Sequence, residues 1–177
     1  MSEGTILSIH LVRMPDGPPE RVESIVAITD HGLEGDQSLY EHSLRVPLIL
    51  AGPGIPKDKY YISMCYNMDL YPTVGNLVGA PVPSSVEGKS LLPVLTAQAT
   101  EIRHTIFAAH EDTLRSIRDY RWKLIFFPQI DRYQLFNLRD DPEEMNDLFP
   151  SGEHGRDINR LRIQMAAWQS SFDDPLR

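Results

Sequence analysis

The strongest constraint on the fold is a helical pattern near the C-terminus. Apolar side chains recur there at spacings of three and four residues, at Ile158, Leu161, Met165, Trp168 and Phe172. This spacing places them on one face of an α-helix. A helix with a single apolar face is stable only when that face is buried against another layer. The sequence therefore predicts a sheet or a second helix packed against this stripe.

Four short runs before this helix have the composition of β-strands. They are residues 105–109, 113–117, 121–127 and 134–137. In the third run, Trp122, Leu124 and Phe126 alternate with other residues and so share one face of a strand. We predict an α+β unit over residues 97–177, in which a four-stranded antiparallel sheet carries the C-terminal helix on one face.

The middle of the chain, residues 37–96, favours part of an α/β arrangement. Apolar residues dominate positions 46–50, which suits a strand covered on both faces. A helix is predicted from Asp69, as its cap, to a stop at Gly79. Its apolar stripe is expected to be Val74, Leu77 and Val78. Residues 1–36, with two β-type runs, form a third, N-terminal segment.

Composition excludes several classes of protein. The net charge of −8 disfavours a nucleic-acid or anionic-membrane surface. No apolar run is long enough to cross a bilayer, and no signal peptide is recognisable at the N-terminus, so we expect a cytoplasmic protein that contacts no membrane. The single cysteine, Cys65, excludes an intrachain disulfide.

Several separated motifs carry a resemblance to a known family. They are the run Gln37–Pro56 with its L-Y-E-H-S, the D-L-Y-P-T-V of Asp69–Val74, the V-E-G-K-S-L-L-P-V-L of Val86–Leu95, and the R-D-Y-R-W-K-L-I of Arg118–Ile125. In this order they resemble the second half of a type I sulfatase. The resemblance implies the edge of a large, alkaline-phosphatase-like α/β domain, followed by a smaller C-terminal sheet with a packed helix. The activity that it implies is metal-dependent hydrolysis of sulfate esters.

A metal site is suggested by T-D-H-G at Thr29–Gly32, which follows an apolar run. In type I sulfatases such a motif at a strand end supplies two ligands to calcium or magnesium, which makes Asp30 and His31 the candidate metal ligands. A carboxylate is a natural ligand for a hard cation, whereas an imidazole is less so. The alternative is an exposed turn before Gly32.

No catalytic residue is assigned. The sulfatase nucleophile arises from Cys or Ser in C/S-x-P-S-R, and Cys65 in M-C-Y-N does not match this motif. Asp36 stands where the family places a lysine that binds the sulfate group, and its carboxylate repels a sulfate ester. We therefore expect the chain alone to be inactive. The alternative is a non-enzymatic structural or interaction module that self-associates or completes a partner subunit.

The N-terminal segment has a second resemblance. Residues 4–36, with G-L-E-G-D at Gly32–Asp36, resemble the first strands of a MOSC domain. This suggests a hybrid chain joined near Gly32–Gln37, and as a weaker alternative the remnant of a MOSC-like sulfur carrier. The alternative interpretation is that Gly32 and Gly35 only provide the backbone freedom that a tight turn requires.

A Glu/His pair and an acidic run receive structural interpretations. Glu41 and His42 are expected to point to opposite sides of an extended segment and to have packing roles. The run Arg139–Asp147 is predicted to start a helix, with Asp141 as cap and Pro142 at the first helical position.

Overall fold

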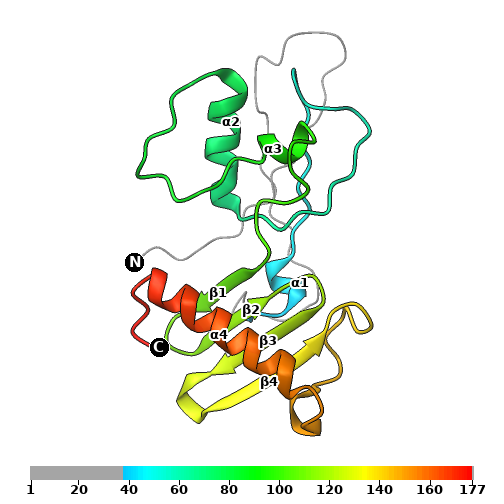
Figure 1. The fold of residues 1–177 in the computed structure, drawn as a ribbon, viewed down its shortest axis with the longest axis vertical. Helices are drawn as coiled ribbons and strands as arrows, with labels where there is room; N and C mark the ends of the chain where they lie inside the picture. Colours follow the sequence, from blue (N-terminus) through cyan, green and yellow to red (C-terminus); the bar gives the residue numbers. More distant parts are fainter. Residues whose placement is uncertain (1–37, 177) are drawn as a thin grey trace. The chain divides into compact units, whose positions relative to one another are not determined.

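The computed structural model describes residues 38–176, which form two compact units (Figure 1). The first unit is Val46–Arg103. The second, here called the sheet unit, combines residues 38–45 with residues 104–176. Residues 38–45 are called the anchor segment below. The sheet unit is therefore assembled from two parts of the chain that are separated by the whole first unit.

The sheet unit is built on an antiparallel meander. Its strands lie in the order β1 (Ile106–His110), β2 (Leu114–Arg118), β3 (Trp122–Phe127) and β4 (Arg132–Asn137). The register places Leu124 opposite Ile117 on one side and opposite Leu135 on the other. Each neighbouring pair is joined by a short connection, as local hairpin pairing requires. The predicted four-stranded sheet is confirmed.

Helix α4 (Gly155–Ser171) covers one face of this sheet. Leu161 and Met165 of the helix are buried among side chains of the strands. The buried core between the helix and the sheet consists of Phe107, Ile117, Trp122, Leu124, Leu135, Leu161 and Met165. Ile158 and Trp168 pack against this core from its margin. The predicted amphipathic helix and its packing are confirmed.

The opposite face of the sheet is covered by the anchor segment. Leu39 is buried, and the ring of Tyr40 meets Phe136 of β4 edge to face. Residues Glu41–Leu44 form the short helix α1, where an extended segment was expected. Because both faces are covered, Lys123 and Ile125 of β3 are as buried as the residues of the α4 face.

The first unit contains two helices, α2 (Leu70–Val78) and α3 (Leu92–Leu95). A 3-10 turn, Asn67–Asp69, precedes α2, and Gly79 ends α2 in the left-handed conformation at φ +72°, as predicted. Gly88 lies against this turn, where a Cβ atom would come within 2.2 Å of the Met68 carbonyl oxygen. Only glycine therefore allows the V-E-G-K-S run to pass so close to the turn before α2.

Two predictions for the first unit are wrong. Residues 46–50 form no strand beyond an isolated bridge at Ile49, because a buried strand needs hydrogen-bonded neighbours and the described residues provide none. Ile49 is 51% exposed. The stripe on α2 is likewise open to solvent, with Val74 and Val78 exposed, while Pro72 and Thr73 are the buried positions.

The helix predicted from Asp141 is also wrong. The Asp141 carboxylate accepts hydrogen bonds from the backbone N–H groups of Met145 and Asn146, at 3.1 and 2.8 Å. Such local side-chain bonds compete with helix formation. Glu144 takes a left-handed backbone conformation with φ +54°, which interrupts any helix there.

Within residues 38–176 no helix is long and apolar enough to span a membrane. The cytoplasmic location stays a prediction.

The α4 interface gives a direct test of the fold. Leu161 is fully buried, so Leu161→Ala is expected to lower the free energy of unfolding by about 2–5 kcal/mol. Ile163 lies on the same helix but is 63% exposed, and Ile163→Ala should change it by less than about 1 kcal/mol. Urea denaturation measures both. Equal losses in the two variants would contradict the assigned face of α4.

Candidate functional site

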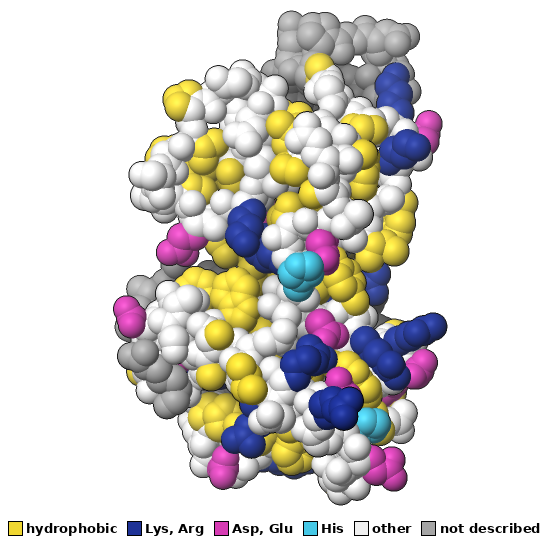
Figure 2. Space-filling model, viewed as in Figure 1, with side chains coloured by type: hydrophobic (Ala, Val, Ile, Leu, Met, Phe, Trp, Pro, Cys, Tyr) yellow, Lys and Arg dark blue, Asp and Glu magenta, His cyan; other side chains and the backbone are white. Residues whose placement is uncertain are grey.

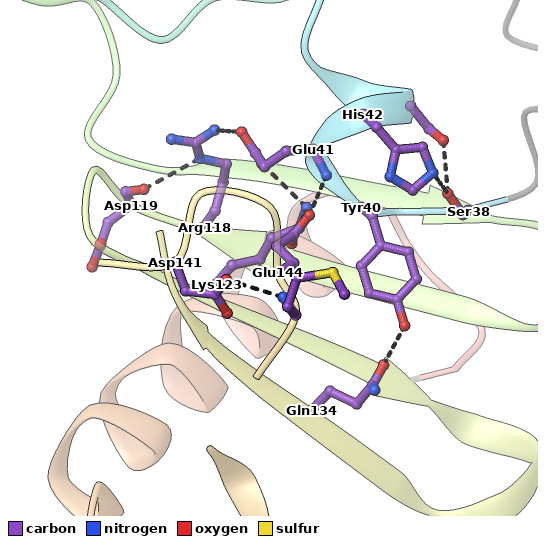
Figure 3. A network of polar contacts seen from close by, with 12 residues as sticks. Ser38, Tyr40, Glu41, His42, Arg118, Asp119, Lys123, Gln134, Asp141 and Glu144 are labelled. Carbon is purple, nitrogen blue, oxygen red and sulfur yellow. Dashed lines mark hydrogen bonds and ion pairs between the residues drawn. The ribbon is translucent and has the colours of Figure 1, made fainter. Parts of the chain in front are cut away.

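The anchor segment is held on the sheet by ion pairs (Figure 3). The carboxylate of Glu41 pairs with the guanidinium of Arg118 on β2 and lies 3.1 Å from the ammonium nitrogen of Lys123 on β3. Arg118 and Lys123 are directly opposite each other in the register. Two like charges so placed repel each other, and Glu41 offsets this repulsion. The predicted structural role of Glu41 is confirmed by these contacts.

Glu144, in the turn that follows β4, completes this network. Its carboxylate lies 2.9 Å from the Lys123 ammonium nitrogen and also accepts the backbone N–H of Glu41, the first residue of α1. Burial raises the pKa of Glu144, an effect that Lys123 and the N–H of Glu41 partly oppose. The network contains two carboxylates and two cations, so its charges balance.

His42 is placed by its neighbours within the anchor segment. Its Nε2 atom lies 3.3 Å from the Ser38 hydroxyl, and its ring stacks on Tyr40 at a centroid distance of 5.8 Å. The Tyr40 hydroxyl in turn donates a 2.8 Å hydrogen bond to Gln134 of β4. The Ser38 hydroxyl is also 2.7 Å from that of Ser43. These contacts place the polar side chains of the anchor segment in fixed positions relative to one another and to β4.

A second buried ion pair organises the first unit. Both nitrogens at the tip of Arg103 donate to the carboxylate of Asp69, and the guanidinium lies 4.7 Å from the ring centroid of Tyr66. Asp69 also accepts the backbone N–H groups of Tyr66 and Lys89, each at 2.7 Å. Asp69 therefore caps the 3-10 turn rather than α2, which corrects the sequence prediction. Its oxygens already accept four donors, which argues against a role as a metal ligand.

The remaining residues considered in the sequence analysis form no metal or catalytic site within residues 38–176. Asp30, His31 and Asp36 lie outside residues 38–176. Those described residues contain no group of three or more His, Cys, Asp or Glu side chains that could hold a metal ion. Cys65 is half-buried, and burial raises the pKa of its thiol, so it is a poor nucleophile.

Another buried pair, which sequence reasoning missed like the two described above, lies at the C-terminal end of the described residues. Arg115 of β2 donates to both carboxylate oxygens of Asp174, at 2.6 and 2.8 Å. The side-chain amide of Gln169 and the backbone N–H of Leu176 donate to the same carboxylate. These contacts, led by the Arg115 hydrogen bond, lower the pKa of Asp174 to about 2. The pair fastens the C-terminal residues to the sheet.

The comparison with protein families decides the ancestry. The profile described as "N-sulphoglucosamine sulphohydrolase, C-terminal" matches residues 29–171. The chain belongs to this sulfatase family. The matched range takes in the anchor segment, the first unit, the sheet and α4 together. The sulfatase motifs identified in the sequence are therefore confirmed as a family signature.

Individual relatives agree with this assignment. The chain is 28% identical over 158 residues to an N-acetylglucosamine-6-O-sulfatase of Bacteroides thetaiotaomicron, covering 82% of this chain and 28% of the relative. It is 30% identical over 146 residues to arylsulfatase K of the dog, covering 70% of this chain and 27% of the relative. It thus spans little more than a quarter of the length of these sulfatases.

Solved structures show the same fold. A phosphonate monoester hydrolase from Silicibacter pomeroyi superposes with a TM-score of 0.68 at 24% identity, over 77% of this chain and 31% of that protein. The predicted fold class, part of an alkaline-phosphatase-like sulfatase with its C-terminal four-stranded sheet and packed helix, is confirmed.

The MOSC-like interpretation of residues 4–36 receives no support from these comparisons. The sulfatase family match begins at Thr29 and so includes Gly32–Asp36, one of the runs on which the interpretation rested. The sulfatase ancestry therefore starts before the predicted boundary at Gln37.

The Arg115–Asp174 pair predicts a pH dependence of stability. The pKa of Asp174 is lower in the folded protein, at about 2, than its ordinary value of 3.8, so its stabilisation is present above about pH 4 and is lost as pH falls toward about 2. The shift corresponds to about 2 kcal/mol. Asp174→Asn should be less stable at neutral pH and should lose about 2 kcal/mol less on acidification.

Denaturant titrations at several pH values measure this difference, with Asp112→Asn at an exposed turn as the control. Parallel pH profiles for the wild type and Asp174→Asn would contradict the assignment.

Proposed function

We propose that residues 38–176 form the C-terminal portion of a sulfate-ester hydrolase, in which the anchor segment borders the site that receives the sulfate group. The observation that carries this proposal is the single family match over residues 29–171, which includes both the anchor segment and the sheet. The ion pairs of Glu41 support it, because they fix that segment to the C-terminal sheet. The two relatives described above are named as sulfatases.

In this proposal the described residues supply support and rim, and the nucleophile comes from elsewhere. None of the 177 residues lies in a C/S-x-P-S-R motif. We expect the chain by itself to hydrolyse no aryl sulfate. Turnover that EDTA abolishes would overturn this expectation.

We further propose a three-part organisation of the chain into residues 1–36, 37–96 and 97–177. The break between the two units after Arg103 supports a boundary near residue 97. The anchor segment belongs spatially to the last part, although it precedes the middle part in sequence. A MOSC-like origin for the residues before Thr29 stays a hypothesis.

Asp30 and His31 are our proposed ligands for calcium or magnesium. Both residues lie inside the family match, and a carboxylate suits either cation. Two side chains fall short of the roughly six ligands that such a cation takes, so binding by this chain should be weak. Calorimetric titration of calcium is expected to show weak binding that Asp30→Asn abolishes. Equal heats for the wild type and Asp30→Asn would rule out this site.

The surface of the first unit indicates where the rest of a sulfatase would dock. Large apolar side chains are exposed across this unit, and Figure 2 shows hydrophobic side chains at its surface. They are Leu48, Ile49, Tyr60, Tyr61, Ile62, Met68, Tyr71, Val74 and Val78. Tyr71, Val74 and Val78 follow one another at spacings of three and four on α2, so they share one exposed face of that helix. A contiguous exposed apolar face supports the proposal of an interaction surface. We infer that the α/β portion present in the longer relatives covers it, and that the isolated chain self-associates through it.

Size-exclusion chromatography with light scattering tests this inference. The wild-type chain should form dimers or larger species, and Val74→Asp with Val78→Asp should shift it toward the monomer. Ile163→Asp, at an exposed apolar position on α4, is the matched control and should leave the mass unchanged. A wild-type chain that is a cooperative monomer would contradict the docking surface.

A further inference from the structure

The ammonium group of Lys123 is fully buried in the middle of the sheet, although nothing in the strand itself can pair with it. Its residue is 0% exposed, and its neighbours in the register are Arg118 and Phe136. A buried charge is tolerated only when hydrogen-bonded counter-charges surround it. The lysine therefore requires acceptors from outside the sheet.

Both carboxylates come from segments outside the sheet that are distant from each other in sequence. Glu41 belongs to the anchor segment, and Glu144 belongs to the turn that follows β4. Their oxygens lie 3.1 and 2.9 Å from the Lys123 nitrogen. Glu144 also accepts the backbone N–H of Glu41, so the anchor segment and the turn after β4 contact each other directly as well as through Lys123.

The backbone of Glu144 takes an unfavourable conformation. Its φ of +54° lies in the left-handed region, which is unfavourable for a residue with a Cβ atom. Such strain persists when surrounding contacts fix the residue, and it is frequent at functional sites. The contacts with Lys123 and with the N–H of Glu41 provide that fixation.

The position of Glu41 determines the position of its neighbours. His42 follows it within the same helical turn, and the adjacent Tyr40 is bound to the sheet through Gln134. In Figure 3, Glu41 points toward the sheet while the ring of His42 lies on the other side of the segment, next to Ser38. A shift of Glu41 would therefore move the polar group formed by Ser38, Tyr40 and His42.

We propose that Lys123 and Glu144 are positioning residues: from β3 and from the turn after β4 they hold Ser38–His42 in the orientation in which this segment meets a sulfate group. This rests on the proposed function. Neither residue touches the sulfate group, and each acts through Glu41. The C-terminal sheet thereby determines the orientation of the anchor segment as well as supporting it.

The test compares two variants of the complete chain with a control. Lys123→Met replaces the ammonium by an apolar group of similar length, and Glu144→Gln keeps the side-chain shape but removes the charge. Glu143→Gln, at the exposed neighbouring position, is the control. Hydrogen–deuterium exchange is followed separately in residues 38–45 and in β2 and β3.

Lys123→Met and Glu144→Gln should speed exchange in the anchor segment about tenfold or more, while β2 and β3 exchange at wild-type rates. Glu143→Gln should change neither. The proposal is overturned if the anchor segment exchanges as in the wild type, or if all strands loosen together with it, which is the result of a merely structural role.

The imidazole resonance of His42, observed by NMR during titration with inorganic sulfate, separates this proposal from the proposed function. A sulfate-dependent shift in the wild type that is lost in Lys123→Met supports both. If sulfate shifts no resonance of Ser38–His42 in the wild type, the proposed function fails, and the exchange rates still decide whether Lys123 and Glu144 position the segment. A shift that is the same in Lys123→Met and the wild type would contradict the positioning role.

Discussion

The sheet unit depends on the burial of one ammonium group, that of Lys123. Because an unpaired charge in this position would be destabilising, the anchor segment and the turn that carries Glu144 are held where Glu41 and Glu144 reach this ammonium group. Glu41 lies in helix α1, before the first unit, and Glu144 lies in a turn after the last strand. One side chain, that of Lys123, therefore joins a segment that precedes the sheet in sequence to a segment that follows it.

The first unit follows the same principle on a smaller scale. Asp69 and Arg103 are 34 residues apart in the sequence, and the carboxylate of their buried pair also accepts the backbone N–H groups of Tyr66 and Lys89. Buried ion pairs add little net stability compared with apolar residues, but a missing partner is costly. In both units the polar residues of the family motifs thus define which segments meet, while the apolar residues supply most of the burial energy.

Sequence periodicity predicted the local elements well and the long-range polar contacts poorly. The alternation at Trp122, Leu124 and Phe126 and the stripe on α4 identified the sheet and the helix, because one buried face leaves a regular pattern. A lysine that alternates with these apolar residues has the pattern of a solvent-facing position, so the sequence did not reveal that the second face of the sheet is also covered. The helix at Asp141 was wrong because a carboxylate suited to a cap formed a local turn instead. Nothing in the described residues tests Asp30 and His31.

The coupling between Glu41 and Lys123 tests the central claim most directly. A double-mutant cycle with Glu41→Gln, Lys123→Met and the double variant is measured by urea denaturation. If the buried ammonium holds the anchor segment on the sheet, the two substitutions should be coupled by about 1–3 kcal/mol. Additivity within about 0.3 kcal/mol would show that the two residues act independently and would contradict the account.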